Sequence, residues 1–155
     1  HGGEMQLNGY GEIVRDEWHC AADGRPEIML DAFVVMPDHV HGIIIIRSTS
    51  IGTVSSVGET RIDVGVSSAV GATRRVAPTA TDTHAITNGP VPRSIGAIVG
   101  QFKSITAKRI NKLRDMNGTA VWQRDYYERI IRDDGELENV RRYIAENPRR
   151  WQAQD

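Results

Sequence analysis

The chain has 155 residues, of which 39% are hydrophobic and 25% charged, and its net charge is −1. These values are typical of a soluble globular protein and predict a single domain spanning residues 1–155. Cys20 is the single cysteine, which excludes an intrachain disulfide, and no apolar run approaches the roughly 20 residues of a membrane span. We therefore expect a cytoplasmic protein without a membrane partner.

The first predicted elements are a short helix and two strands. An amphipathic pattern predicts the helix over residues 12–18, and the stop and turn signals of residues 24–26 follow it. Residues 28–35 and 39–47 are predicted strands. Their connection at residues 37–38 is so short that we expect the two strands to pair antiparallel.

Two histidines, His39 and His41, stand at the start of the second predicted strand. Because side chains on a strand alternate between faces, both imidazoles should point the same way while Val40 points to the opposite layer. Two imidazoles at a fixed spacing can form half of a metal site. The alternative is a pair of hydrogen-bonded polar side chains on a half-buried strand.

The middle of the chain, residues 48–93, is rich in Ser, Thr, Gly, Val and Ala and contains no aromatic residue. A structureless segment of this length exceeds the roughly 12–15 residues usual for loops in compact domains. We expect a low-complexity, mobile insert that interrupts the domain. A tolerated insertion and a role in gripping DNA or a partner both stay open.

The next predicted elements are a long helix and a strand. Ser94 is the expected N-cap of the helix, which is predicted to end at residues 117–118. The strand runs through residues 126–131. We expect one of the adjacent Tyr126 and Tyr127 to pack and the other to face solvent or DNA.

The last predicted helix begins with the acidic pair at residues 133–134 and is expected to end at Pro148, because proline disfavours helical geometry in the residue before it. Its four-residue spacing places Tyr143 and Asn147 on one face. Its apolar residues recur at helical spacing: Leu137, Val140 and Ile144.

The His-hydrophobic-His strand followed by a helix with the Tyr-Ile-x-x-Asn-Pro motif resembles the single-tyrosine HUH transposases, specifically the REP-associated (IS200-like) tyrosine transposases. The resemblance covers nearly all of the chain except its middle. Further segments that support it occur in the family's order: residues 30–37, 102–104, 121–128 and 147–151.

The resemblance implies that Tyr143 attacks a DNA phosphodiester and becomes a 5′-phosphotyrosine, leaving a free 3′-hydroxyl. Phenol is a weak nucleophile at its usual pKa of about 10, so a divalent cation is expected nearby. By the same resemblance, His39, His41 and Asn147 would bind Mg²⁺ or Mn²⁺. The tyrosines of the preceding strand are rival nucleophiles, but each has an isoleucine rather than a polar residue four positions later.

Basic residues are concentrated in the second half of the chain. Residues 1–46 contain two basic and eight acidic side chains, whereas residues 94–155 contain twelve basic and nine acidic ones. Such clusters can neutralise phosphates and would make DNA affinity depend on salt. The resemblance implies that the partner is single-stranded or hairpin DNA. The residues expected to contact it are Lys103, Arg124, Arg141 and Arg142. For the helix that carries Lys103, a solvated face is an equally good interpretation.

The order of the predicted elements indicates an α+β fold, a ferredoxin-like antiparallel sheet with its helices packed on one face. Members of the family that the chain resembles ordinarily have one more strand before the first helix, so we expect the first strand to be missing here and a sheet edge to be exposed. We expect a monomer or a homodimer.

Three functions stay open: a metal-dependent transposase that nicks and joins single-stranded hairpin or repeat DNA, a DNA-binding descendant that recognises repeats without transposition, and an RNA- or partner-binding module without chemistry. The third would be expected to expose aromatic residues on its central strands, as sheet-based RNA binders do. Phe33 is the only aromatic residue on the first two strands.

Overall fold

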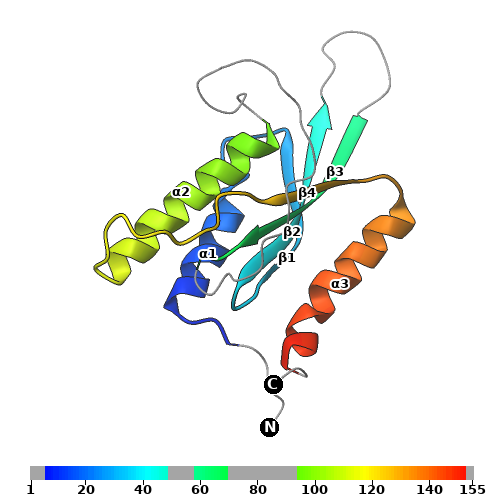
Figure 1. Ribbon diagram of the computed structural model, residues 1–155. Helices are drawn as coiled ribbons and strands as arrows, with labels where there is room; N and C mark the ends of the chain where they lie inside the picture. The colour runs from blue at the N-terminus through cyan, green and yellow to red at the C-terminus, as the bar shows by residue number, and fades with distance from the viewer. Residues whose placement is uncertain (1–5, 49–57, 70–93, 153–155) are drawn as a thin grey trace.

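The computed structural model describes residues 6–48, 58–69 and 94–152, and these form a four-stranded sheet covered by three helices (Figure 1). The expected α+β class with an antiparallel sheet is confirmed. No helix among the described residues has the length and apolar character needed to cross a bilayer. In chain order the elements are α1 (Gly9–Cys20), β1 (Ile28–Val35), β2 (His39–Ser48), β3 (Gly58–Ser67), α2 (Ile95–Leu113), β4 (Tyr127–Ile131) and α3 (Asp134–Gln152).

The strands lie in the order β1-β2-β3-β4, and every neighbouring pair is antiparallel. The predicted hairpin of β1 and β2 is confirmed, with Val35 opposite Val40 beside the connection and a register shift between Leu30 and Phe33. β2 is a central strand, so the two histidines near its start lie inside the sheet rather than at its edge.

β3 corrects the prediction of a structureless insert at residues 48–93. It pairs with β2 along its whole length and with β4 on its other side. Ile62, Val64 and Val66 alternate along it and are buried, which is the ordinary pattern of a half-buried strand. The rest of the predicted insert, residues 49–57 and 70–93, lies outside the described residues.

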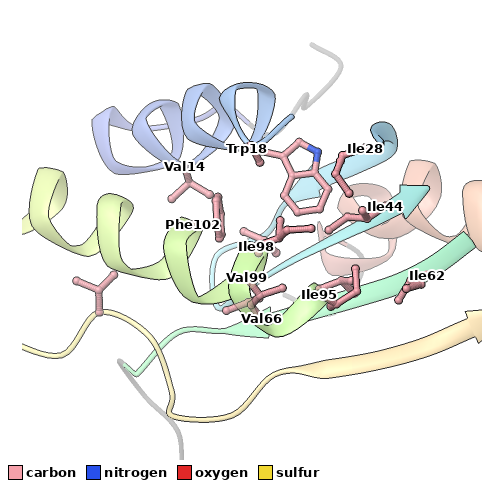
Figure 2. Close-up of a cluster of buried hydrophobic side chains, with 14 of the residues drawn as sticks. Val14, Trp18, Ile28, Ile44, Ile62, Val66, Ile95, Ile98, Val99 and Phe102 are labelled. Carbon is pink, nitrogen blue, oxygen red and sulfur yellow. The ribbon is translucent and has the colours of Figure 1, made fainter. Parts of the chain in front are cut away.

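α1 and α2 pack side by side on one face of the sheet. Figure 2 shows Val14 and Trp18 of α1 and Phe102 of α2 facing the strands, where they join one buried cluster with Ile44. Trp18 is 3% exposed and meets the Phe102 ring edge-on, with 5.8 Å between ring centroids. This cluster forms the main core.

α3 covers the opposite face, which corrects the prediction that all helices pack on one face (Figure 1). Ile43 and Ile45 of β2 are buried under α3, whereas Ile44 between them is buried under α1 and α2. The apolar run in β2 therefore serves two layers, as expected for a strand covered on both faces. The apolar face predicted for the last helix is confirmed, since Leu137, Val140 and Ile144 are buried.

Gly42 allows α1 to approach the strand that carries the histidines. Trp18 stacks on Phe33 with 4.4 Å between ring centroids, and a Cβ built on Gly42 would lie 2.5 Å from Trp18 Cζ2. Real Cβ atoms essentially never come that close, so the bare backbone of Gly42 is what admits the indole ring. Gly42, the residue after His41, thus allows α1 to pack closely on the face of β2 opposite α3.

The helix ends differ from expectation in two places. Ser94 caps α2 as predicted, with its Oγ accepting from the Ala97 amide at 3.2 Å, but the helix ends at Leu113, before residues 117–118. α3 continues through Pro148 instead of ending there. Proline removes one backbone donor and its ring crowds the carbonyl four residues earlier, and the ion pair between Glu146 and Arg150, 2.7 Å apart, spans this position on the helix.

Candidate active site

Tyr143 lies on the outer part of α3 and contacts His41 of β2. The two rings meet edge-to-face, with 5.4 Å between centroids and 70° between planes. Tyr143 is 43% exposed, and the guanidinium of Arg150 lies 5.9 Å from its ring centroid. Two motifs about a hundred residues apart in the sequence are therefore adjacent in the fold.

An open cleft of about 930 Å³ lies between α3, β3 and β4, and both Tyr143 and His41 line it. Exposed polar side chains form much of its wall. Tyr127 and Arg129 come from β4, Arg132 and Asp133 from its connection to α3, and Asn139 from α3. The cleft therefore combines aromatic, basic and acidic groups around the exposed tyrosine.

His41 contacts Asp63 of β3 at the base of this cleft. Its Nε2 atom forms a short hydrogen bond with Asp63 Oδ1, and both side chains are nearly buried, at 13% and 6% exposed. Sequence reasoning missed Asp63 because it lies within the segment predicted to be an unstructured insert. The alternation of Ile62, Val64 and Val66 around it was the signal that could have revealed the strand.

His39 lies between a carboxylate and the amide of Asn147. Its Nδ1 is 2.6 Å from Asp38 Oδ1, and its Nε2 is 3.4 Å from Asn147 Nδ2. The amide oxygen and nitrogen of an asparagine exchange places by a simple rotation, so the oxygen of Asn147 can also face His39. The predicted set is thus arranged as two contacts, Asn147 with His39 and Tyr143 with His41.

Asn147 is buried at 8% exposed, which is unusual for a polar side chain near the end of a surface helix. Among the described residues, no group of three His, Cys, Asp or Glu side chains could hold a metal ion. A cation at the two histidines would therefore depend on the amide of Asn147 as a further protein donor.

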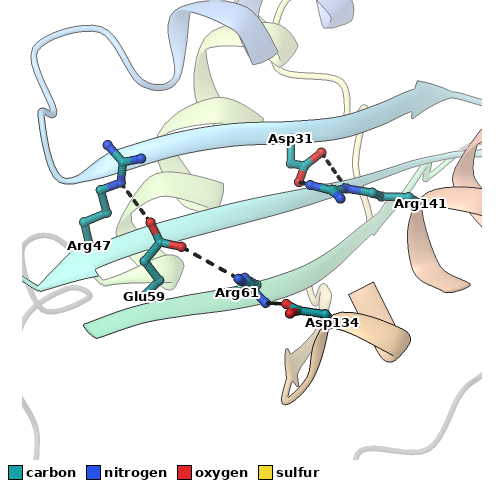
Figure 3. A network of polar contacts seen from close by, with 6 residues as sticks. All are labelled: Asp31, Arg47, Glu59, Arg61, Asp134 and Arg141. Atoms are coloured by element: carbon teal, nitrogen blue, oxygen red, sulfur yellow. Dashed lines mark hydrogen bonds and ion pairs between the residues drawn. The ribbon is translucent and has the colours of Figure 1, made fainter. Parts of the chain in front are cut away.

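Ion pairs fasten α3 to the sheet around this site. Figure 3 shows that Arg141 forms an ion pair with Asp31 of β1, and that Arg61 of β3 forms one with Asp134 at the start of α3. Nη2 of Arg141 is 2.5 Å from Asp31 Oδ2, and Nη1 of Arg61 is 2.5 Å from Asp134 Oδ1. Glu59 continues the network from Arg61 to Arg47 of β2.

Asp31 is partly desolvated, which opposes its ionisation, but the hydrogen bonds from Arg141 and the Ala32 amide more than offset this effect. The pKa of the Asp31 carboxyl is therefore lowered from its ordinary value. Arg141, expected from the sequence to contact DNA, has its guanidinium bound to this carboxylate. Its position two residues before Tyr143 makes it an anchor of the tyrosine helix.

The other three residues expected at DNA are Lys103, Arg124 and Arg142. Lys103 lies on α2, across the sheet from α3, and its Nζ donates to the carbonyls of Gln123 at 2.6 Å and Arg124 at 2.8 Å, with a longer contact to Asp125 at 3.3 Å. An ammonium has three donors, so these contacts occupy it fully. Burial lowers the pKa of Lys103, an effect that Asp125 partly opposes.

Arg142 and Arg124 are exposed, and neither guanidinium has an ion-pair or hydrogen-bond partner within residues 6–48, 58–69 and 94–152. Arg142 is next to Tyr143 on α3, whereas Arg124 lies in the segment before β4. Of the four expected basic residues, these two have side chains available for phosphates.

The adjacent tyrosines at the start of β4, Tyr126 just before the strand and Tyr127 as its first residue, differ as predicted. Tyr126 packs against the core cluster beside α2, and burial together with Glu128 raises its pKa to about 12. Tyr127 is 52% exposed and lines the cleft with Tyr143. Because it lies in the same cleft, Tyr127 is thus the alternative to Tyr143 as a candidate nucleophile.

Comparison with known proteins identifies the family to which the chain is similar. A family profile described as "Transposase IS200 like" matches residues 81–147, which include Tyr143 and Asn147 but not the histidine strand. An uncharacterized protein of Haemophilus influenzae is 31% identical over 149 residues, which cover 96% of this chain and 70% of that protein. No solved structure gives a significant match. The chain belongs to the IS200-like transposase family, and hence to the enzymes that cleave and join DNA.

Proposed function

We propose that the protein is a metal-dependent endonuclease and strand transferase that acts on single-stranded DNA at hairpins or repeats through a 5′-phosphotyrosine on Tyr143. The observation that carries the proposal is the edge-to-face contact of Tyr143 with His41, 5.4 Å between centroids, on the wall of an open cleft. It brings an exposed phenol against one histidine of the pair, as a shared reaction centre requires.

The proposed step is a transesterification at phosphorus. The Tyr143 oxygen attacks the phosphate, a new oxygen–phosphorus bond forms, and the bond to the 3′ oxygen breaks. The phenolic proton is lost and the departing 3′ oxygen gains one, so charge balances without a nucleotide cofactor. In the reverse direction a 3′-hydroxyl attacks the phosphotyrosine, which joins strands and frees Tyr143.

Tyr143 suits the role of nucleophile better than Tyr126. The hydroxyl of the half-buried Tyr126 donates to Glu128 at 3.1 Å, and burial together with Glu128 raises the pKa of Tyr126 to about 12. A phenol that resists deprotonation and lies on the far face of the sheet cannot serve the cleft. Tyr143, by contrast, is 43% exposed and lines the cleft.

The residues that would hold the cation are His39, His41 and Asn147. Their donor chemistry fits a divalent ion, because the amide oxygen suits Mg²⁺ or Mn²⁺ and the imidazoles shift the preference toward Mn²⁺. The 3.4 Å approach of the Asn147 amide to His39 Nε2 supports the set, since donors from β2 and α3 converge there. When bound, the cation would neutralise charge on the phosphate oxygens.

The cleft also suits an unpaired strand. Tyr127 offers an exposed ring on which a base can stack, and Arg132 on the same wall can neutralise a phosphate. Arg142 extends the basic surface beside Tyr143. A double helix needs no such exposed aromatic surface, so we infer that the bases at the scissile phosphate are unpaired.

A denaturing gel that detects covalent protein–DNA adducts tests the proposal. The protein is incubated with single-stranded hairpin oligonucleotides and Mn²⁺ or Mg²⁺, beside an EDTA control. Tyr143→Phe is the test variant, and Tyr127→Phe is its matched control because both rings line one cleft. We expect an adduct in the wild type and in Tyr127→Phe, and none with EDTA or in Tyr143→Phe.

An adduct that survives Tyr143→Phe would refute the assigned nucleophile, and one that forms in EDTA would refute metal dependence. If no adduct forms although the protein binds the hairpins with strong salt dependence, the chain is instead a DNA-binding descendant that recognises repeats without transposition.

A further inference from the structure

Asp63 is a buried carboxylate at the centre of the sheet. Its residue is 4% exposed, and its side chain points to the α3 face between β2 and β4, opposite Ile43 on one side and Arg129 on the other. Burying a charge is costly unless a partner compensates for it. The identity of that partner therefore indicates what Asp63 is for.

The nearest arginines do not supply the compensation. Arg129, directly across from Asp63, pairs with Glu136 at 2.8 Å, and Arg61 pairs with Asp134 at 2.5 Å. Among the described residues, the side-chain partner of Asp63 is the imidazole of His41. The Asp63 carboxylate thus pairs with a histidine, although Arg61 and Arg129 lie at neighbouring positions of the sheet.

The two histidines of β2 are held in the same manner. In each, one ring nitrogen faces an aspartate: Nδ1 of His39 faces Asp38, and Nε2 of His41 faces Asp63. The second nitrogen of His39 faces Asn147. The second nitrogen of His41, Nδ1, has no hydrogen-bond partner in the described part of the chain.

This arrangement is typical of metal sites in which a carboxylate hydrogen-bonds to a metal-binding histidine without touching the metal. A histidine that binds a metal through one nitrogen usually donates the other N–H to a carboxylate, which fixes the tautomer and the ring orientation. The two aspartates differ in setting, because the side chain of Asp63 is 6% exposed whereas that of Asp38 is 55% exposed. Water competes with Asp38 for its histidine but not with Asp63.

We propose that Asp63 is a positioning residue of the metal site: its carboxylate accepts the N–H of His41 Nε2 and presents the opposite nitrogen, Nδ1, to the cation. This inference rests on the proposed function, since it assumes that His41 is a ligand. It assigns a role to β3, the strand that links His41 to β4 and the cleft wall.

Metal binding without DNA tests this role. Mn²⁺ is titrated into the wild-type protein and into Asp63→Asn, with free Mn²⁺ followed by electron paramagnetic resonance. Loss of an outer partner typically weakens metal affinity by about 10–100-fold, and we expect a loss in this range for Asp63→Asn. Asp38→Asn, at the exposed counterpart, should lose less. His41→Ala should lose Mn²⁺ binding most.

Thermal unfolding in EDTA separates positioning from simple folding. Asp63→Asn keeps the shape of the side chain and removes its charge, so the metal-free midpoint should stay near that of the wild type while Mn²⁺ affinity falls. Asp63→Ser, which also removes the carboxylate, should weaken Mn²⁺ binding in the same way if Asp63→Asn folds poorly.

Unchanged Mn²⁺ affinity in Asp63→Asn, next to lost binding in His41→Ala, would overturn the role of Asp63 and leave the metal site standing. A wild-type protein that does not bind Mn²⁺ would refute the metal site itself, and the positioning role with it.

Discussion

Arg141 of α3 holds the carboxylate of Asp31 on β1 through Nε and Nη2, with 2.5 Å between Nη2 and Oδ2. The pair ties the tyrosine helix to the edge of the sheet two residues before Tyr143. An arginine expected to contact DNA therefore anchors the helix that carries Tyr143 to the sheet.

Replacing Asp31 by Asn should loosen this fastening and destabilise the protein most at neutral pH. The folded-state pKa of Asp31 is lowered, so its contribution is present above the unfolded-state pKa and is lost as pH falls through the folded-state pKa. The difference in unfolding free energy between wild type and Asp31→Asn, measured with urea, should therefore shrink as the solution is acidified from pH 7.

Asp16→Asn is the control for this series, because Asp16 forms an exposed pair with its neighbour Arg15 at 3.1 Å. Exposed pairs contribute little, so we expect almost no difference from wild type at any pH. A gap for Asp31→Asn that stays constant down to strongly acidic pH would contradict the ion-pair account.

Gly42→Ala should destabilise the fold by about 1–3 kcal/mol, the usual effect of overpacking a core. The added Cβ would lie 2.5 Å from the Trp18 ring, which is itself stacked on Phe33. Gly100→Ala is the matched control, because a Cβ there meets nothing within 4 Å and the position is helical. That variant should gain roughly 0.5–1 kcal/mol. Chemical denaturation of both variants measures these effects, and equal stabilities would refute the packing argument.

Arg142 and Lys103 should behave differently in DNA binding. Arg142→Gln should lower the slope of log affinity against log salt by about 0.7, the value for one phosphate contact on a single strand. Lys103→Met should leave the slope unchanged and lower the unfolding midpoint, because Lys103 holds the carbonyls of Gln123 and Arg124. Fluorescence anisotropy at several salt concentrations distinguishes them. A reduced slope for Lys103→Met would restore the sequence-based expectation that it contacts DNA.

The site should be completed within one chain. α3 packs on its own sheet through Ile144, against Ile43 of β2, and it begins at Asp134 only shortly after β4 ends at Ile131. A mixture of His41→Ala and Tyr143→Phe should therefore form no adduct with hairpin DNA. Recovery of adduct in the mixture would show that α3 is exchanged between subunits of a dimer.

Much of the fold could be predicted from the sequence because helices and strands depend largely on local sequence patterns. Periodicity and turn residues predicted β1, β2, α2 and most of α3, and the spacing of Tyr143 and Asn147 placed them on one helix face. β3 was missed because a strand of ten residues lies within a long Ser-, Thr- and Gly-rich stretch whose average composition conceals the alternation around Asp63.

What the sequence could not reveal depends on long-range packing. Ile43 and Ile45 look no different from Ile44 in a continuous apolar run, so the layer that each one meets, and hence the face covered by α3, emerges only in three dimensions. The bond from Asp63 to His41 depends on the β2–β3 register in the same way. The predicted end of α3 at Pro148 was wrong, because proline lowers helix propensity locally without breaking a helix that packing supports.

The most direct test of the account is to identify the residue that carries DNA after the adduct is digested with nuclease and trypsin. Cleavage after arginine separates the candidates, since Tyr143 lies on the peptide of residues 143–149 and both tyrosines of the β4 region lie on residues 125–129. We predict that mass spectrometry finds the phosphonucleotide on residues 143–149. Its presence on residues 125–129 would contradict the assignment of Tyr143 as the nucleophile.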